Sequence, residues 1–316
     1  MPTARVEAQA KVNLFLRILG READGYHQLE TLFQRISLAD SIVVRTAASG
    51  RSLECTGADT GPVEQNLAWR AALAFSDAAG WPDAFAIEIV KQIPVGGGLG
   101  GGSADAGATL RALNAMAPKP LPIETLFGMA RSLGSDVPFF ASDTPTALGL
   151  VRGDVIVACP APSARDMILL VPPFGVSSAE AFGWYAAAHK DTPRQVSRIA
   201  TPASGIALAT VEAALARDDS GRQVPGTGTG FSWRDIGALS GNDLQGVVVE
   251  RHPEIGTAIA LLRAAGAPVA QMTGSGSTVF GVFLSRPSGG MVPIQPGFTV
   301  LHAQTLTEVA QVELED

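Results

Sequence analysis

Residues 94–106 read PVGGGLGGGSADA, and this stretch decides how the rest of the chain is interpreted. Six glycines fall within the nine residues 96–104, so the backbone carries few Cβ atoms and several N–H groups can approach one anion. A helix is expected over residues 103–116, with Ser103 as its N-cap, and its positive dipole end would face the same place. The run therefore predicts a phosphate-binding loop, in which Ser103 and Asp105 could add oxygen ligands for a nucleotide-bound magnesium ion.

Other interpretations of the glycine run are weaker. A Walker A loop is excluded because no Gly-Lys-Ser or Gly-Lys-Thr occurs in the chain. Gly96, Gly98 and Gly101 satisfy the dinucleotide fingerprint of a dehydrogenase, but a run so rich in glycine matches it trivially. The acid at a suitable distance, Glu124, begins a helix-like stretch instead of ending a strand. A flexible linker would join two domains, whereas this run lies between a strand at 85–90 and a helix.

Upstream of the glycine run the pattern is mainly that of strands, and downstream helices follow. Alternating apolar residues and turn signals predict an antiparallel β start. Helices are predicted where apolar residues recur at helical spacing, and their ends are predicted at proline or glycine. The predicted elements are strands at 6–19, 29–38 and 41–46, a turn at Asp24 and Gly25, a helix at 66–79, the strand at 85–90, and a helix at 123–132 that ends at Gly134.

The pattern of the amino-acid sequence changes after Gly149, so we place a domain boundary near residue 150. The predicted domains are 1–150 and 151–316. The second half is expected to hold strands at 167–171 and 278–284, helices at 242–250 and 254–265, and loops at 202–205, 226–230 and 274–277. The segment 218–234 is rich in loop-forming residues, and no function is inferred from it. The pattern predicts an α+β protein of two lobes.

The composition excludes several classes of protein. The chain has 316 residues, 46% hydrophobic content and a net charge of −7, without a stretch rich in lysine or arginine, so nucleic acid is not an expected partner. Cys55 and Cys159 lie far apart, which suggests neither a disulfide framework nor a thiolate metal site. Charges at Arg5, Glu7 and Lys11 interrupt any apolar leader, and no run of eighteen apolar residues occurs. We expect a cytoplasmic protein that does not enter a membrane and is a monomer or weak homodimer.

Four segments resemble the GHMP small-molecule kinases and occur in the order of that family. They are AKVNLFLRILGREADGYHQLETLFQ at 10–34, IPVGGGLGGGSADA at 93–106, LGSDVPFF at 133–140 and MTGSGSTVFGVF at 272–283. The resemblance implies the two-lobed GHMP kinase fold, with an N-terminal ATP-binding lobe like ribosomal S5 domain 2 and a C-terminal ferredoxin-like α/β lobe. It also implies ATP-dependent phosphorylation of a small-molecule alcohol.

The resemblance assigns roles to individual residues of the first and third segments. Lys11 would lie beside the acceptor hydroxyl, and Asp136 would be the general base that receives its proton. Tyr26 would stack on a cytosine ring, and His27 would hydrogen-bond to the edge of that ring. The implied acceptor is therefore cytidine diphosphate-linked methylerythritol, phosphorylated on its 2-hydroxyl. Homoserine and mevalonate are the alternative acceptors.

The remaining site residues follow from the same segments. Magnesium is expected to arrive with ATP, with Ser103 as the candidate protein ligand. Expected ATP-binding residues are Pro94, Gly96, Gly97, Gly98, Leu99, Gly100, Gly101, Gly102, Ser103 and Asn66, and expected acceptor-binding residues are Asn13, Tyr26, His27, Gly274 and Ser275. Helix capping explains Asn66 equally well.

One stretch departs from the family. Residues 147–156, ALGLVRGDVI, replace its usual Ala-x-x-x-Gly-x-Gly-Glu pattern, with Arg152 inserted and Asp154 where glutamate is common. This departure concerns local geometry and leaves the chemistry of Lys11 and Asp136 in place. A nucleotide-binding protein without catalysis is a further alternative, which the presence of both residues disfavours.

Overall fold

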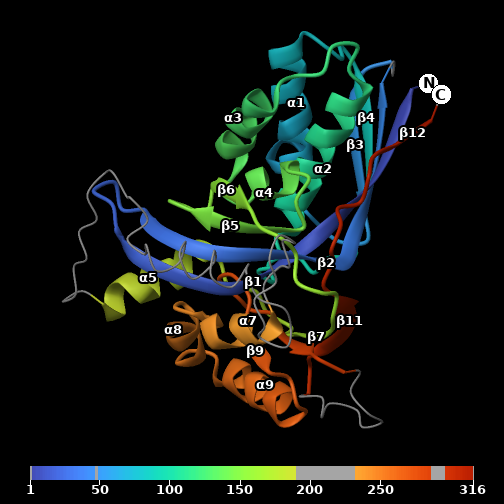
Figure 1. The fold of residues 1–316 in the computed structure, drawn as a ribbon. Helices are drawn as coiled ribbons and strands as arrows, with labels where there is room; N and C mark the ends of the chain where they lie inside the picture. The colour runs from blue at the N-terminus through green and yellow to red at the C-terminus, as the bar shows by residue number, and fades with distance from the viewer. Residues whose placement is uncertain (1, 47–48, 190–231, 286–295, 316) are drawn as a thin grey trace, which may run out of the picture.

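The computed structural model describes residues 2–46, 49–189, 232–285 and 296–315 (Figure 1). The loops expected at 202–205 and 226–230, and most of the segment 218–234, lie outside these ranges. The strands are β1 (Thr3–Arg21), β2 (His27–Thr46), β3 (Arg51–Thr56), β4 (Phe85–Val90), β5 (Thr146–Leu150), β6 (Val155–Ala158), β7 (Asp166–Val171), β8 (Gly241–Asn242), β9 (Val269–Met272), β10 (Val279–Phe283), β11 (Thr299–Gln304) and β12 (Glu313–Glu315). The helices are η1 (Val63–Gln65), α1 (Leu67–Ala79), α2 (Gly101–Met116), α3 (Ile123–Leu133), α4 (Val137–Ala141), α5 (Ser178–Ala188), α7 (Trp233–Leu239), α8 (Gln245–Val249) and α9 (Pro253–Ala264).

The long hairpin of β1 and β2 runs through the middle of the molecule (Figure 1). The two strands pair antiparallel along their length and join at the predicted turn, where Gly25 has a φ of 91° that favours glycine. The expected strands at 29–38 and 41–46 are one continuous strand, β2. The first half of β2 pairs with β5 and the second half pairs with β4. The two expected strands are therefore two parts of one strand that have different partners.

The first sheet carries the helices of the N-terminal half. Its strand order is β12-β1-β2-β4-β3, with β5 and β6 extending from β2 and β8 beside β1. Helix α1 buries Ala68, Ala71, Ala72 and Phe75, which lie at helical spacing on one face, and it packs against α2. Helix α2 in turn packs against β1 and α4. The glycine run connects β4 to α2 within this lobe.

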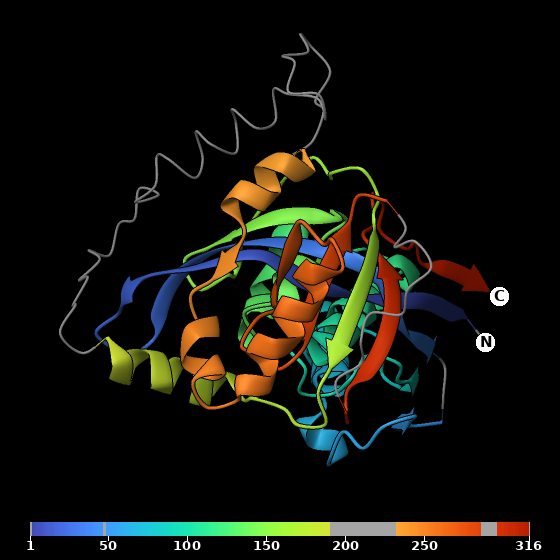
Figure 2. The ribbon, with the colours of Figure 1, turned by 90° about the horizontal axis from the view of Figure 1, so that it is seen from below.

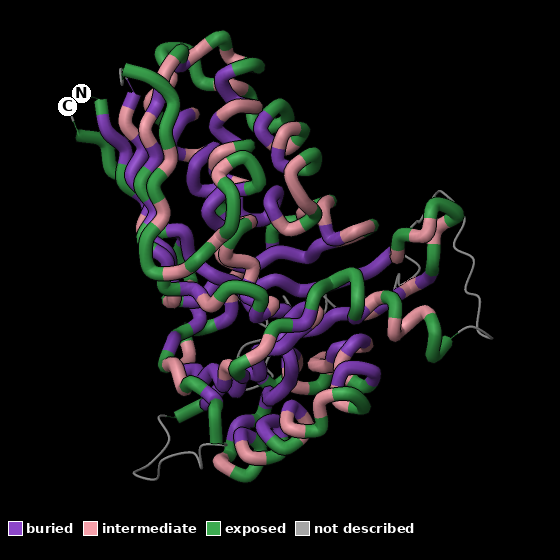
Figure 3. Tube along the Cα trace, turned by 180° about the vertical axis from the view of Figure 1, so that it is seen from behind, coloured by how far each residue is buried: buried purple, intermediate pink, exposed green. Residues whose placement is uncertain are grey.

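A second antiparallel sheet, in the order β11-β7-β10-β9, forms the other lobe (Figure 2). Helix α9 packs on β9 and β10 and contacts α8, and together they bury a separate apolar core. Leu16 and Ile18 of β1 belong to this second core, whereas Val12 and Leu14 belong to the first. The middle of the hairpin is buried from both sides, while its tip is exposed (Figure 3). The protein thus has the expected α+β fold in two lobes, joined through β1.

Several element boundaries differ from the sequence-based expectation. Helix α2 begins at Gly101 and not at Ser103, because Gly100 takes the N-cap position with a φ of 76° and the last glycines of the run are already helical. The helix expected from residue 242 begins at Gln245, because Asn242 instead pairs with β1 in β8. The division at residue 150 stays a prediction; β6, which follows it, pairs with β5 in the first sheet.

Candidate active site

A cavity of about 590 Å³ lies between the two lobes and gathers most of the predicted site residues. Its walls come from β1, β2, the glycine run, the start of α4 and the loop between β9 and β10. The predicted residues that line it are Lys11, Asn13, Asn66, Pro94, Gly96, Gly97, Gly98, Leu99, Gly100, Gly101, Gly102, Ser103, Asp136, Gly274 and Ser275. The cavity lining does not include Tyr26 and His27.

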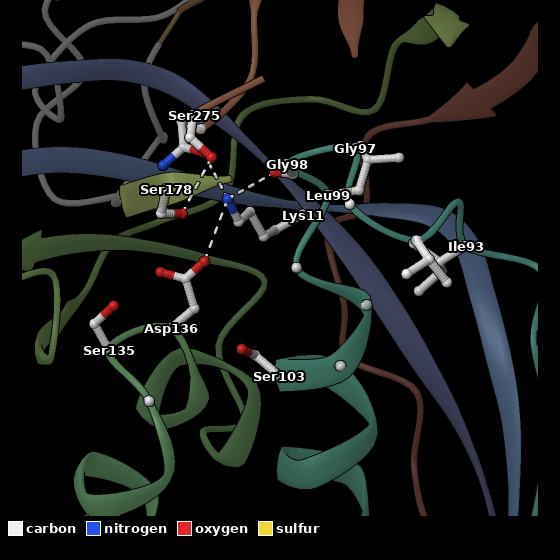
Figure 4. Close-up of a pocket in the computed structure, with 18 of the residues that line it drawn as sticks. Lys11, Ile93, Gly97, Gly98, Leu99, Ser103, Ser135, Asp136, Ser178 and Ser275 are labelled. Atoms are coloured by element: carbon white, nitrogen blue, oxygen red, sulfur yellow. Dashed lines mark hydrogen bonds and ion pairs between the residues drawn. The ribbon is translucent and has the colours of Figure 1, made fainter. Parts of the chain in front are cut away.

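Lys11 is almost fully buried at the centre of this cavity (Figure 4). Its ammonium group donates to Asn13 Oδ1 at 2.7 Å and to the Gly98 carbonyl at 3.0 Å, and it lies 3.3 Å from Asp136 Oδ2. An ammonium group has three N–H donors, and the two hydrogen bonds use two of them. Lys11 therefore ties the glycine run to Asp136.

Asp136 stands at the N-terminus of the short helix α4 and makes no capping bond with its side chain. Its carboxylate is therefore free to face Lys11, and it points into the cavity opposite the glycine run (Figure 4). The side chain is 29% exposed, so a substrate hydroxyl can reach it. Behind it, buried Arg35 donates to the carbonyls of Phe139, Phe140, Ser142 and Thr144 and fixes the far end of α4 to β2.

The glycine run is held by its backbone. Its Leu99 carbonyl accepts from Lys11 N at 3.1 Å, and its Gly97 carbonyl accepts from Thr278 N at 3.2 Å. Gly98 has a φ of 77°, and a Cβ there would lie 2.4 Å from the Thr273 carbonyl oxygen. Only glycine fits this position, because the conformation is left-handed and the neighbour is rigid backbone.

Ser103 and Asn66 lie at two helix starts beside the loop. Ser103 occupies the first turn of α2, and its hydroxyl points into the cavity from the side opposite Asp136 (Figure 4). Asn66 is the N-cap of α1, where its side-chain oxygen accepts from Ala68 N at 2.9 Å. The capping explanation of Asn66 is therefore confirmed, and Asn66 also lines the cavity.

The side-chain amide of Asn13 is used within the protein. It donates to Thr31 Oγ1 at 2.7 Å, while its oxygen accepts from Lys11 and from Thr273 Oγ1 at 3.2 Å. Lys11 and Asn13 are two residues apart on β1, so they project from the same face of the strand. This arrangement orients the lysine toward the glycine run and Asp136.

The loop between β9 and β10 closes the cavity from the second lobe. Gly274 has a φ of 56°, and its carbonyl accepts from Nδ2 of buried Asn242 at 2.8 Å. Ser275 Oγ lies 3.1 Å from Ser178 Oγ at the start of α5 (Figure 4). The loop is thus anchored to β8 on one side and to α5 on the other.

The turn that carries Tyr26 and His27 lies at the rim of the cavity. Tyr26 is 61% exposed, and the guanidinium of Arg152 lies 4.1 Å from its ring centroid. Arg152 also pairs with Glu22 and with Asp24. The hydrogen bond from Arg152 is the main cause of the lowered pKa of Glu22.

His27 lies against the other lobe. Its ring stacks on Phe182 of α5 with centroids 5.1 Å apart. Burial lowers the pKa of His27, and the charge of Arg21 lowers it further, so the imidazole is neutral at neutral pH. Arg152 and Phe182 both line the cavity, so the two predicted residues border it through these neighbours.

A buried charge cluster lies beneath the glycine run. Lys91 pairs with Asp40 and, at 2.7 Å, with Asp105 Oδ2. Burial raises the pKa of Asp105, and Lys91 offsets only part of that rise. Asp105 therefore faces Lys91, and it also belongs to the cavity lining. A contact of Asp105 with a nucleotide-bound magnesium ion stays a prediction.

Comparisons with known proteins identify the family. The description "GHMP kinases N terminal domain" matches residues 66–144, and "GHMP kinases C terminal" matches residues 230–289. A 4-diphosphocytidyl-2-C-methyl-D-erythritol kinase of Desulfotalea psychrophila is 39% identical over 285 residues, which cover 88% of this chain and 85% of the relative. The chain belongs to the GHMP kinases.

Other GHMP kinases agree with this assignment. A 4-diphosphocytidyl-2-C-methyl-D-erythritol kinase of Pelotomaculum thermopropionicum is 39% identical over 90% of this chain and 91% of its own length. A crystal structure of 4-(cytidine 5'-diphospho)-2C-methyl-D-erythritol kinase has a TM-score of 0.70 at 30% identity, covering 95% of this chain and 98% of that one. A homoserine kinase from Cytophaga hutchinsonii, at 16% identity and a TM-score of 0.66, shares the fold.

Sequence reasoning missed four features of this GHMP kinase site. Lys91 was passed over, although it is one of only four lysines and stands three residues before Pro94, where a strand meets the glycine run. Arg152 was noted only as a departure, and its partners are fixed by the β1–β2 turn. No pattern in the sequence marks Phe182 or Thr31 as residues of the cavity, because their positions depend on how the two lobes pack.

Metal-binding clusters and membrane-spanning helices are both absent from the described residues. No group of three or more His, Cys, Asp or Glu side chains is arranged among them to hold a metal ion. No helix in those same ranges is long and apolar enough to cross a membrane.

Proposed function

We propose that this GHMP kinase transfers the γ-phosphoryl group of ATP to the 2-hydroxyl of 4-diphosphocytidyl-2-C-methyl-D-erythritol, in non-mevalonate isoprenoid precursor biosynthesis. The observation that carries the proposal is the contact of Lys11 with both Asp136 and the Gly98 carbonyl, because it joins a candidate base to a candidate phosphate loop. The relatives named for this reaction, at 39% identity over most of the chain, support the choice of acceptor.

The glycine run is the proposed ATP site. The free N–H groups at the start of α2 and the positive end of its dipole favour the phosphates without a basic side chain from the loop. Asn66 and Pro94 line the same cavity next to the loop and would border the nucleoside.

Catalysis requires a base and charge neutralisation around the transferred group. Asp136 accepts the proton of the 2-hydroxyl as its oxygen attacks the γ-phosphorus and ADP leaves. Lys11 holds Asp136 in place and stabilises negative charge as it develops on the acceptor oxygen. Asn13 acts here by orienting Lys11.

Magnesium would reach the site with ATP. The residues fit such an ion only sparsely: the Ser103 hydroxyl faces the cavity, and the described side chains form no metal-binding cluster of their own. This matches the preference of Mg²⁺ for substrate phosphates, water and few protein ligands. When bound, the ion supplies charge neutralisation at the phosphates.

The acceptor would lie across the cavity from the glycine run. Tyr26 offers an exposed aromatic face for the cytosine ring, and neutral His27 has one donor and one acceptor for the edge of the base. Gly274 and Ser275 would cover the part of the acceptor near the reacting hydroxyl.

The test is a panel of acceptors offered to the purified protein with ATP and magnesium. We expect turnover with the cytidyl compound and none with homoserine or mevalonate. Turnover with homoserine or mevalonate alone would overturn the proposed acceptor while leaving a GHMP kinase. ATP binding without turnover of any acceptor would favour the non-catalytic alternative, and binding of a nicotinamide nucleotide in its place would favour a dehydrogenase.

We propose that the enzyme works in the cytoplasm as a monomer or weak homodimer. The soluble, charged acceptor and the unpaired cysteines Cys55 and Cys159 support the compartment. Light scattering during gel filtration tests the assembly state, and a stable higher oligomer would contradict it.

A further inference from the structure

We infer that the buried cluster of Asp40, Lys91 and Asp105 is a positioning device that ties both ends of the glycine run together and thereby sets the affinity for ATP. The inference rests on the proposal that ATP binds at this run. None of the three residues has a role in the transfer chemistry described above.

Asp40 fixes the entrance to the glycine run. Its Oδ1 accepts from the backbone N–H groups of Gln92 and Ile93, at 2.5 Å and 2.8 Å. These residues immediately precede Pro94, so the carboxylate of a β2 residue sets the direction in which the chain leaves β4 and enters the loop.

Lys91 connects this entrance to the exit. Its ammonium group pairs with Asp40 Oδ2 on one side and with Asp105 Oδ2 of α2 on the other. The backbone N–H of Lys91 donates to the Thr56 carbonyl at 2.8 Å, which fixes the lysine to the neighbouring strand. One side chain thus spans the base of the loop, from the end of β4 to the first turns of α2.

The glycine run packs directly on this cluster. A Cβ at Gly101 would lie 3.1 Å from Ile93 Cγ2 and 3.3 Å from Lys91 Nζ. Displacement of Ile93 or Lys91 would therefore move the backbone whose N–H groups face the phosphates. The loop holds its shape because strand and helix are fixed at a set distance beneath it.

The degree of burial makes the cluster a strong constraint. Asp40, Lys91 and Asp105 are 0%, 7% and 2% exposed. Two carboxylates face one ammonium group, and Asp105 Oδ1 is buried without a hydrogen-bond partner. Such a cluster is costly to bury, so its members hold the three chain segments in one arrangement. Loss of the lysine would leave two buried carboxylates without compensation, and loss of either carboxylate would remove one of the two ties to Lys91.

The experiment compares Asp40→Asn and Asp105→Asn with the wild-type protein. An asparagine at position 40 can still accept a loop N–H, but its amide presents donors or an uncharged oxygen to the Lys91 ammonium group. We expect this variant to raise the dissociation constant and the KM for ATP by about tenfold or more, with the KM for the acceptor changed by less than about twofold. Asp105→Asn frees only the α2 side, and we expect a rise of about threefold for ATP.

Arg35→Lys is the matched control, because Arg35 is a buried charge on the same strand that anchors α4 instead of the glycine run. It should lower the unfolding temperature without changing the dissociation constant of ATP, measured by fluorescence titration. The inference would be overturned if Arg35→Lys raised the dissociation constant of ATP as much as Asp40→Asn does, at an equal loss of stability. It would also be overturned if folded Asp40→Asn and Asp105→Asn variants bound ATP like the wild type. If Asp40→Asn does not fold, Asp105→Asn decides alone. Absence of ATP binding in the wild type would overturn the proposed function instead.

Discussion

The two ends of the cavity are built in different ways. At the proposed ATP end, the glycine run is fixed by backbone hydrogen bonds to Lys11 and Thr278 and lies on the buried cluster of Asp40, Lys91 and Asp105. At the proposed acceptor end, the β1–β2 turn carries Tyr26 on an exposed hairpin tip, held by the partly exposed side chain of Arg152.

This difference follows from what each end has to recognise. Phosphates are bound by N–H groups in a fixed geometry, so the ATP end gains from rigid, water-free anchoring. A base is recognised by the face and edge of its ring, which side chains on a surface turn can supply. Under the proposed function, the buried end therefore carries the chemistry shared by the fold, and the exposed end carries the selectivity. Four substitutions test this division.

Asp136→Asn is expected to have the largest effect, because this residue lies where the two ends meet. Loss of the base should lower kcat by at least about 100-fold, while ATP binding stays nearly intact. Steady-state kinetics and an ATP titration measure the two quantities. Asp143→Asn is the control, since Asp143 is exposed on the same segment outside the cavity lining, and it should leave kcat unchanged. Unchanged turnover in Asp136→Asn would show that another group takes the proton.

Gly98→Ala tests the rigidity of the ATP end. The added Cβ would meet the Thr273 carbonyl oxygen at 2.4 Å in a left-handed conformation, so the loop has to shift. We expect ATP affinity to fall by at least about tenfold, with a loss of stability of about 1–3 kcal/mol or more.

Gly128→Ala is the matched control for that substitution. Gly128 lies within α3, outside the cavity lining, and its added Cβ would meet no atom within 4 Å. This variant should fold and bind ATP like the wild type. Equal ATP affinity in Gly98→Ala and Gly128→Ala would contradict the tight fit of the glycine run.

Arg152→Ala tests the acceptor end. It removes the partner of Glu22 and Asp24 and the cation against the Tyr26 ring, which should loosen the turn. We expect the KM for the cytidyl acceptor to rise about fivefold, with the KM for ATP unchanged. Arg45→Ala, which breaks a surface pair with Glu88 outside the cavity lining, should change neither constant. If Arg152→Ala raised the KM for ATP instead, the proposed division of roles between the two ends would be contradicted.

Val151→Gly should have the smallest effect. Val151 has a φ of 64°, which is unfavourable for a β-branched side chain, while its carbonyl accepts from Leu29 N at 2.7 Å. Glycine relieves this strain and keeps the hydrogen bond, so the free energy of unfolding should increase by about 1 kcal/mol in urea denaturation. Val157→Gly, at an equally exposed position within β6, should lower it. A destabilised Val151→Gly variant would show that the strained backbone is not costly.

Sequence-based prediction was more successful for the glycine run than for the β1–β2 turn. Local signals were strong around the glycine run: the strand at 85–90 and the helix cap at Asn66 were predicted correctly. The start of α2 was predicted two residues late, because a propensity argument favours Ser103 as a cap over glycines that the loop forces into a helix. The roles of Tyr26 and His27 stay predictions, since they border the cavity only through Arg152 and Phe182.

The sequence by itself determined the α+β class, the family and the segments that carry Lys11, Asp136 and the glycine run, because each is marked by residues adjacent in the chain. Only the tertiary structure decided what holds these segments in register. Asp40 lies on β2, Lys91 directly follows β4 and Asp105 lies on α2, while Arg152 reaches back to a turn more than a hundred residues earlier. Such contacts leave no periodic trace in the sequence, because the packing of strands and helices alone brings their charges within reach of one another.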